Sequence, residues 1–485
     1  MKFVKKTAAL LAALACIAAF ASCAGSAGND AGNGAETASK SPRAEEADRV
    51  PYVEPTGEDV LAEFGSADFG GYEFRIMTSS RNRFVAEEDS AGLLNPAIAE
   101  RNALLEERFN FKIREIYCKD SDFLSNLSAS VGSGRQVADA VSFQRSGVSA
   151  AAAGNLLMNL YSVPYLQTDM AYLDTALVEK CTAKNELYVV YEPSSLFYSD
   201  LMCVVYNRAL IGGGYDTVYV PARDGEWYYD SMLELAETAA YEVMRKRSPD
   251  TARDTFGIVS LYEKPELLHE SFLSSGYALF GDTFHREIEY NADLETADAV
   301  AKGVSALYSS KCFMNADPDT AAKAFREGRA AFAVCRVSFI AALENSTLDW
   351  GVAPFPKLTK DQDSYYSCIS DTACGISVPE CQTDPARTGK ILTLLFASSS
   401  VGLEEAFWKD LTIYTLHDNA SALLLKEVFG SPVTDMTILY YQGESRLPGL
   451  GRDTILEAVQ SGKSFESLTS ANAIALREMN ALDFK

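Results

Sequence analysis

The sequence predicts an α/β fold of layered sheets and helices, and three stretches carry the prediction. Residues 325–356 contain the end of a helix, a buried strand, a short helix and a second strand. Residues 72–77 are a compact strand that ends in a polar loop before a helical pattern. Residues 139–143 are another buried strand, followed by an alanine-rich helix. Strands that alternate with helices indicate a layered sheet.

Length and composition describe an ordinary globular chain. The 485 residues suffice for two or three domain-sized cores, and the chain is 47% hydrophobic and 23% charged. The formal net charge of -24 repels phosphate backbones and anionic membrane surfaces. Nucleic acid is therefore not expected as a partner.

The first residues indicate export. Lys2, Lys5 and Lys6 precede an apolar stretch, residues 7–21, that is too short to span a bilayer, and small residues lead to Cys23. The pattern resembles a bacterial lipoprotein signal, with residues 1–22 removed and Cys23 lipidated. A plain secretory signal is the alternative, and both signals export the protein. With the lipid anchor, the expected location is the outer face of the cell membrane, or the periplasm-facing membrane in a Gram-negative bacterium.

The rest of the chain is expected to be a soluble body on a tether. Residues 23–60 include a stretch rich in Ala, Gly, Ser, Asp and Glu, which cannot bury enough apolar surface to order itself. No later stretch reaches the roughly 18 continuous apolar residues that a membrane helix needs. The lipid anchor is therefore the only expected membrane contact.

Eight cysteines remain beyond position 23, and no C-x-x-C motif argues for a zinc ribbon. An even number in an exported protein permits disulfides, with Cys368, Cys374 and Cys381 close enough to pair locally. Buried free thiols are the alternative.

In the amino-terminal part, the strand at 72–77 leads into the polar loop 78–81, and ligands of open α/β sheets sit at such carboxyl ends. Asn95 is expected to cap a helix that runs to residue 109 and leads to a strand at 111–117. A helix at 125–134 precedes the strand at 139–143.

In the middle of the chain, strands at 188–191 and 201–206 precede a helix that Asp230 can cap, and Trp227 is expected in the core. Asp319 and Thr320 can cap the helix before Gly328. The predicted elements that follow are a strand at 330–336, a helix at 338–344, strands at 350–356 and 369–379, a helix at 384–399 and a helical tail at 403–485.

The order of these elements resembles the bacterial extracellular solute-binding proteins that feed ABC importers, and in particular their carbohydrate-binding members. Those proteins carry an F-x-x-G-(K/R)-x-A-(M/F) junction between helix and strand. The matching residues here are Phe325, Gly328, Arg329, Ala331 and Phe332.

The resemblance implies a two-lobed, periplasmic-binding-protein type II-like fold, with a mixed sheet flanked by helices in each lobe and hinge strands between the lobes. Residues 61–193 with about 370–405 would form lobe 1. Residues 194–369 with about 406–485 would form lobe 2.

The resemblance, with the expected loop positions, also implies a ligand site at the carboxyl ends of the strands. Phe143 and Phe339 would offer ring faces to a sugar, and polar side chains would bind its hydroxyl groups. The polar residues proposed for this role are Ser80, Gln144, Arg145, Asp200 and Asp371. Arg81 and Arg336 are expected on loops at the same edge.

The expected ligand is therefore a small polar solute, with an oligosaccharide favoured, and ABC permease subunits are the expected protein partners. Converging arginines would instead favour an anionic sugar or a peptide carboxylate. Two rival functions are an exported glycan hydrolase on the cell surface and a binding module that serves a sensor.

Motifs for catalysis, metals and cofactors are incomplete. His269 and Glu270 begin H-E-x-x-H, but Leu273 takes the place of the second histidine. Glu457 replaces the first glycine of a phosphate-binding loop. Gln144 replaces the first glycine of the G-x-S-x-G motif around Ser146. We predict no catalytic residue, metal ion or cofactor.

Overall fold

In the computed structural model, the described residues belong to one compact unit, Glu54–Lys485. The structure describes residues 57–481 apart from 66, 82, 88–91, 171, 193–195, 213–215, 284–286, 417 and 436–448. The predicted signal peptide and Cys23 lie outside the described residues. The predicted tether extends too far, because residues 57–60 already belong to helix α2 (Gly57–Glu63), in which Gly57, Val60 and Leu61 are buried.

The first sheet contains four strands in the order β13-β3-β1-β2. Strand β1 (Tyr72–Thr78) lies parallel to β2 (Phe111–Tyr117) and to β3 (Ala140–Gln144). Strand β13 (Cys374–Ser377) returns from late in the chain and pairs antiparallel with β3. Burial of apolar side chains holds these strands in the core, and the fully buried residues include Phe74, Ile76, Ala140 and Ile376.

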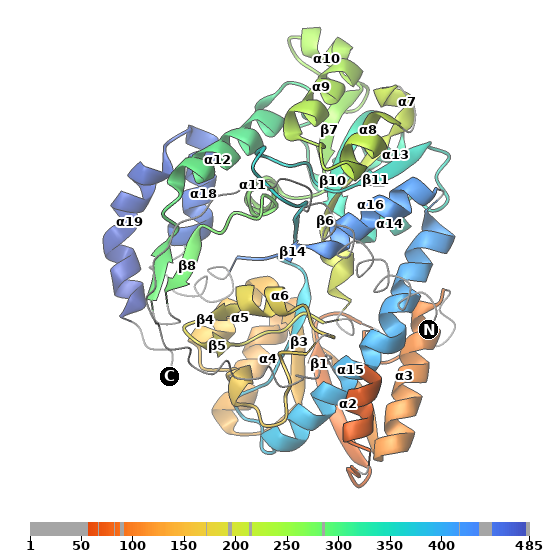
Figure 1. The fold of residues 1–485 in the computed structure, drawn as a ribbon, viewed down its shortest axis with the longest axis vertical. Coiled ribbons are helices and arrows are strands. Elements are labelled where there is room, and N and C mark those ends of the chain that lie inside the picture. The colour runs from red at the N-terminus through yellow and green to blue at the C-terminus, as the bar shows by residue number, and fades with distance from the viewer. Residues whose placement is uncertain are drawn as a thin grey trace, which may run out of the picture. The chain divides into compact units, whose positions relative to one another are not determined.

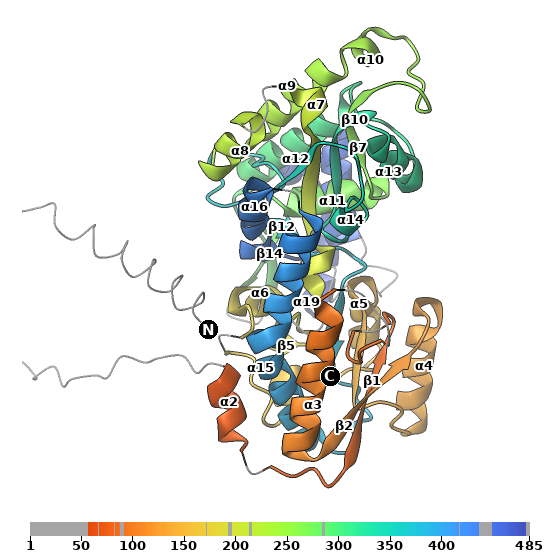
Figure 2. The same ribbon diagram turned by 90° about the vertical axis from the view of Figure 1, so that its right-hand side faces the viewer.

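Helices enclose this sheet (Figures 1 and 2). They are α3 (Leu94–Phe109), α4 (Asp120–Ser133), α5 (Arg145–Ala153) and α15 (Pro385–Lys409), and α2 packs beside α15. Among the described residues, one helix, Pro385–Ile413, is long and apolar enough to cross a membrane, and 67% of its most apolar window is buried. It packs as a core helix against α2 and α3.

The second sheet has the order β11-β6-β10-β7. Strand β10 (Ala330–Arg336) pairs parallel with β7 (Phe256–Ser260) and antiparallel with β6 (Met202–Asn207), which also pairs antiparallel with β11 (Trp350–Ala353). The helices of this region are α7 (Arg208–Ile211), α8 (Asp216–Arg223), α9 (Tyr229–Ala239), α10 (Tyr241–Arg245), α11 (Lys264–Leu273), α12 (Leu294–Ser309), α13 (Pro318–Arg326), α14 (Ser338–Ala341), α16 (Asn419–Gly430), α18 (Thr454–Ser461) and α19 (Phe465–Asn480).

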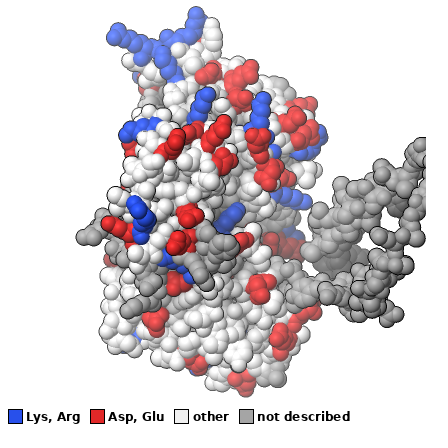
Figure 3. Space-filling view, turned by 60° about the vertical axis from the view of Figure 1, so that its left-hand side comes forward, with Lys and Arg blue, Asp and Glu red and all other residues white. Residues whose placement is uncertain are grey.

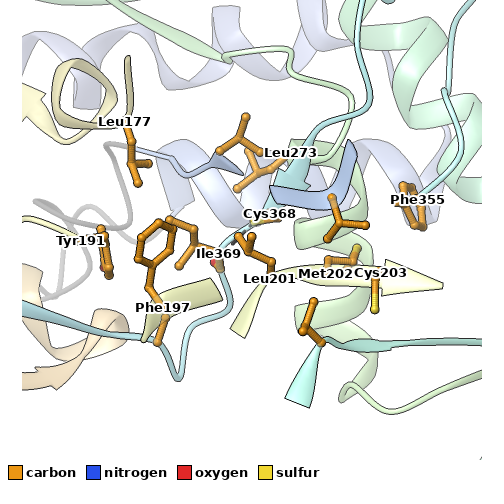
Figure 4. Packing of buried hydrophobic residues seen from close by; sticks show 14 of the residues in the cluster. Leu177, Tyr191, Phe197, Leu201, Met202, Cys203, Leu273, Phe355, Cys368 and Ile369 are labelled. Carbon is orange, nitrogen blue, oxygen red and sulfur yellow. Dashed lines mark hydrogen bonds between the residues drawn. The ribbon is translucent and has the colours of Figure 1, made fainter. Parts of the chain in front are cut away.

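Short segments connect the regions of the two sheets. The 3-10 turn Phe197–Asp200 leads into β6, and Leu201 forms an antiparallel bridge with Ile369. Ile369 follows the two-residue strand β12 (Ser367–Cys368), which pairs with β14 (Pro432–Val433). Figure 4 shows the apolar side chains packed around this connection.

The remaining described elements are small. They are α6 (Thr175–Lys180), the hairpins β4 (Thr182–Ala183) with β5 (Glu186–Leu187) and β8 (Phe280–Thr283) with β9 (Glu287–Tyr290), and turns at Leu160–Ser162, Asp410–Thr415 and Gly449–Asp453.

The sequence placed β10 at its observed bounds, but several expected helix caps are wrong. Asp410 accepts hydrogen bonds from the Leu93 and Leu94 amides at the start of α3, whereas Asn95 contacts Glu87. Asp317, not Asp319, caps α13 through the amide of Thr320. A distant carboxylate, Asp410, sets the start of α3, and Pro318 at the first turn sets the start of α13. Neither residue is part of the periodic apolar pattern.

Two further boundaries also differ. Helix α9 begins at Tyr229, so Asp230 lies inside its first turn and does not cap it. Helix α15 continues to Lys409 rather than ending at residue 399, since Leu403, Ala406 and Phe407 stay buried. Trp227 has no exposed surface, which confirms its predicted place in the core.

Candidate functional site

The segment of residues 370–374 brings side chains from both sheets together. On one side, the amide of Arg145 donates to the carbonyl of Ala373, and Gln144 pairs with Cys374. On the other side, the amide of Ser370 donates to the carbonyl of Asp200 just before β6. The ends of β3 and β10 and the start of β6 therefore meet at one segment, which we call the central segment.

Arg145 is the most enclosed charge of the cluster. It is the first residue of α5 and is fully buried, and its guanidinium forms an ion pair with the Asp371 carboxylate. Its Nε donates to the Ser370 carbonyl at 3.2 Å and its Nη1 to Thr434 Oγ1 at 3.0 Å. Burial disfavours the charge of Arg145, but Asp371 together with Cys368, Glu270 and Tyr191 outweighs this, so the pKa of Arg145 is raised.

Asp371 joins two arginines. Its second carboxylate oxygen lies 2.9 Å from Arg452 Nη1. Arg452 lies two residues before the start of α18. Burial would raise the pKa of Asp371, yet the charges of Arg145 and Arg452 prevail and lower it. Asp371 is therefore a carboxylate, as a residue that neutralises two guanidinium groups must be.

Arg336 ends β10 and reaches the same segment. Its Nε donates to Ser370 Oγ at 2.6 Å and its Nη2 to Glu266 Oε1 at 2.6 Å, while the guanidinium carbon lies 4.6 Å from the centre of the Tyr262 ring. Ser370 Oγ in turn lies 3.2 Å from Glu266 Oε1. Arg336 is thus held in place by one carboxylate, one hydroxyl and one ring.

Glu270, one turn after Glu266 on α11, is a fully buried carboxyl group. Its Oε1 accepts a hydrogen bond from the Asp371 amide at 3.1 Å and lies 4.0 Å from Arg145 Nη2, while its Oε2 has no hydrogen-bond partner in the structure. Burial and the nearby Glu266 raise the pKa of Glu270 well above its ordinary value.

Asp200 lies at the entry to β6. It is 3.9 Å from Arg83 Nη2 and 3.3 Å from Ser199 Oγ. Burial raises the pKa of Asp200, and Arg83 and Arg336 offset this only in part. Ser80 is also in this region, since its hydroxyl lies 3.5 Å from the Cys374 sulfur.

The three remaining predicted residues are not in the cluster. Phe143 is 2% exposed and stacks on Phe123 with ring centres 4.9 Å apart, so it offers no open ring face. Arg81 is exposed and lies over the Tyr117 ring at 3.7 Å. Phe339 is partly exposed and contacts Phe325 edge to face.

Sequence reasoning missed Arg83, Glu266 and Arg452 as members of the cluster. Glu270 stands in a recognisable motif, the incomplete zinc pair that it forms with His269, but that motif does not point to this cluster. The signal that was available is the i, i+4 spacing of Glu266 and Glu270, which puts two carboxyl groups on one face of α11.

Three carboxyl groups approach one another as metal ligands do. The ligand oxygens of Glu266, Glu270 and Asp371 lie within 4.8 Å of one another. Each also faces a guanidinium, because Arg336 contacts Glu266 and Arg145 lies near both of the others. A cation would have to enter against these positive charges, so we assign no metal to the group.

Two cavities lined by described residues do not contain the predicted ligand residues. Each has a volume of about 490 Å³, and one lies between α12 and the α18–α19 turn while the other lies between α2, α3 and α15. Acidic side chains are spread over the face in Figure 3, and basic ones gather at the end where α10 lies in Figure 1.

No protein-family model matches the chain, and no curated protein matches it in sequence. Solved structures match its fold. A galacto-N-biose/lacto-N-biose I-binding protein of an ABC transporter from Bifidobacterium longum, in complex with lacto-N-biose, has a TM-score of 0.54 at 13% identity, covering 86% of this chain and 99% of that one.

Two further structures agree. A cyclo/maltodextrin-binding protein with maltotetraose has a TM-score of 0.52 at 14% identity, covering 84% of this chain and 97% of that one. The GacH receptor of Streptomyces glaucescens has a TM-score of 0.51 at 12% identity, covering 84% of this chain and 98% of that one. The predicted two-lobed, periplasmic-binding-protein type II-like fold is confirmed.

Proposed function

We propose that the protein is the substrate-binding component of an ABC importer and binds a small polar solute, an uncharged oligosaccharide, between its two lobes. The observation that carries this proposal is the polar cluster around residues 370–374. It lies where the end of β3, the end of β10 and the start of β6 meet, at the connection between the two sheets. Ligands of open α/β sheets bind at strand ends.

The pairing of charges within the cluster favours an uncharged ligand. Arg145 and Arg452 face Asp371, Arg336 faces Glu266, and Arg83 approaches Asp200. An anion would have to compete with these carboxylates for each guanidinium. Hydroxyl groups can instead accept and donate at the edges of ion pairs that remain intact.

Partly exposed groups are available for the contacts that a sugar requires. Phe339 offers an apolar ring, while Ser80, Gln144 and Thr372 are partly or fully exposed donors and acceptors. Sugar sites combine aromatic faces for C–H surfaces with a few polar groups for hydroxyls. Phe143 is left out of the proposed site because its ring is enclosed.

Delivery to permease subunits and the lipid anchor at Cys23 belong to the same proposal. The similar fold of the transporter component from Bifidobacterium longum supports the first. The amino-terminal pattern of basic, apolar and small residues before Cys23 supports the second, and it would hold the body at the outer face of the membrane.

A glycan hydrolase is the less favoured function. Hydrolysis needs a proton donor and a carboxylate, and the cluster does contain two carboxyl groups with opposite pKa shifts, Glu270 upward and Asp371 downward. Glu270 is fully buried, however, and its Oε1 is taken by the Asp371 amide. A glycosidic bond has no access to this acid.

A thermal-shift screen tests the proposal. The protein would be heated with neutral mono- and oligosaccharides, with uronates and with short peptides, and each compound that binds would be recovered and checked for cleavage. We expect a neutral sugar to raise Tm and to be recovered intact. A Tm shift with peptides or uronates alone, or cleavage of the bound sugar, would contradict the proposal.

A further inference from the structure

Two cysteines face each other across neighbouring strands of the second sheet. Cys203 on β6 is the direct partner of Cys335 on β10 in the antiparallel register, and their sulfur atoms lie 3.8 Å apart. Both side chains are fully buried. Figure 4 shows Cys203 next to Met202, close to the connection between the two sheets.

This placement has the geometry of a cross-strand disulfide. Directly opposed residues of antiparallel strands have Cα atoms about 4.5 to 5.5 Å apart, and disulfides accept Cα separations of about 4.4 to 6.8 Å. The 3.8 Å contact shows that both sulfur atoms point to the same side of the sheet. Small rotations about the Cα–Cβ bonds would bring them to bonding distance.

Other cysteines have different surroundings. Cys118 lies 3.2 Å from the Asn126 side-chain nitrogen, Cys374 lies 3.5 Å from two serine hydroxyls, and Cys381 lies 3.4 Å from Ser130 Oγ. The local pairing considered for Cys368, Cys374 and Cys381 is not formed, and all three are free thiols in the structure, as are Cys203 and Cys335.

We propose that Cys203 and Cys335 form a disulfide when the chain folds in contact with a disulfide oxidant, such as glutathione disulfide or the disulfide of a thiol oxidoreductase. The Cys203 thiolate attacks the oxidant, releases one thiol and forms a mixed disulfide. The Cys335 thiolate then attacks the Cys203 sulfur and releases the second thiol. The cysteine pair loses two electrons and two protons, and the oxidant becomes two thiols.

Burial sets the moment of this reaction. The hydrogen bond between the two thiols and burial raise the pKa of Cys203, which disfavours its thiolate in the folded sheet, and the burial of both sulfur atoms excludes the oxidant. The bond must therefore form before β6 and β10 close over the sulfur atoms. Once formed, it is shielded from reductants by the same burial.

The bond would join the two strands beside the connection between the sheets. In the register, the next pair after Cys335 and Cys203 is Arg336 and Met202. Arg336 holds Ser370 of the central segment, and Leu201, just before Met202, bridges to Ile369. A covalent link at this point stabilises the start of β6 and the end of β10, from which the connection to the first sheet leaves.

Peptide mapping of the full chain tests the proposal. The protein would be unfolded in urea and refolded in mixed reduced and oxidised glutathione. It would then be unfolded again in urea with an alkylating reagent, so that buried free thiols react, and digested. We expect one dominant linked peptide that joins Cys203 to Cys335, and a Tm several degrees above that of protein refolded with reductant. Alkylation of both cysteines as free thiols, or a different dominant pair, would overturn it.

Two variants complete the test. Cys335→Ala should refold without a dominant linked peptide, and its Tm should be the same with and without oxidant. Cys312→Ala, a change at another buried cysteine of the same region, should keep the link and the oxidant-dependent rise in Tm. If Cys335→Ala fails to fold, the mapping of the unmodified protein still decides the outcome.

Discussion

Replacing Asp371 by Asn tests the ion-pair cluster. Asp371 is the carboxylate that neutralises Arg145, which is fully buried, and Arg452, which is partly exposed. Asn has the same shape and keeps one oxygen that can accept a hydrogen bond. The substitution therefore removes charge while changing the packing little.

The structure sets the expected cost. With Asn at 371, the carboxyl group nearest to Arg145 is Glu270, whose Oε1 lies 4.0 Å from Arg145 Nη2, and burial raises the pKa of Glu270 and disfavours its charged form. Breaking a buried pair by removing one partner costs about 3 to 5 kcal/mol. Arg452 can turn to solvent and Asn keeps a hydrogen bond, so we expect a loss near the lower limit, about 3 kcal/mol.

Equilibrium unfolding in urea at neutral pH measures this loss. Asp224→Asn is the matched control, because it removes the same charge from an Arg–Asp pair whose side chains are about half exposed, 53% for Arg223 and 46% for Asp224. Such surface pairs contribute little, and we expect no measurable change in the control.

The pH dependence provides a second check on Asp371. Its folded pKa is lowered, so the stabilisation is complete above the unfolded pKa of about 3.9 and is lost as pH falls through the folded pKa. The difference between wild type and Asp371→Asn should narrow in acid. Equal stability of the two proteins at neutral pH would refute the assignment of a buried ion pair.

Three other predictions follow. Because the folded pKa of Glu270 is raised, the free energy of unfolding of the wild type should fall as pH rises from about 4.3, the unfolded pKa, through the folded pKa. Glu270→Gln should remove this fall, and urea unfolding at several pH values measures it. Phe332→Ala should lower the free energy of unfolding by about 3 to 5 kcal/mol because its ring is fully buried, whereas Phe339→Ala should weaken ligand binding in calorimetry and keep the wild-type Tm. Gly375→Ala should lower Tm, since a Cβ there would overlap the Val189 side chain, while Gly402→Ala in α15 meets no atom within 4 Å and should raise Tm slightly. A tolerated Gly375→Ala, a destabilised Phe339→Ala or an unchanged pH profile for Glu270→Gln would each contradict its prediction.

Much of the fold was accessible from local patterns. The strand Ala330–Arg336 was placed at its observed bounds because a run of small and apolar residues lies between Gly328 and a charged end. The two-lobed fold came from the order of such elements. The lobe boundaries near residues 193, 370 and 405 stay a prediction.

The site was accessible only in part. Strand ends placed Arg145, Arg336, Asp200 and Asp371 on one edge, and the structure brings them to the central segment. Their partners come from distant parts of the chain, as with Arg452 and Asp371, and no local pattern reports such contacts. The ligand-binding roles stay predictions.

Burial explains why Phe143 does not offer the open ring face that was predicted for it. Phe143 lies one residue before the end of β3, but its ring turns into the core against Phe123. A sequence shows that a residue follows a strand, and it does not show on which side of the sheet the side chain lies when both faces are covered by helices.

Hydrogen–deuterium exchange with and without a bound neutral oligosaccharide tests the central claim most directly, because one experiment reports both binding and its location. We predict slower exchange on binding in peptides that contain the central segment, the loop around Ser80 and the end of β10 after Arg336. The peptides of α10 and α12 should exchange at unchanged rates. Protection confined to other regions, or no protection with any neutral sugar, would contradict the account.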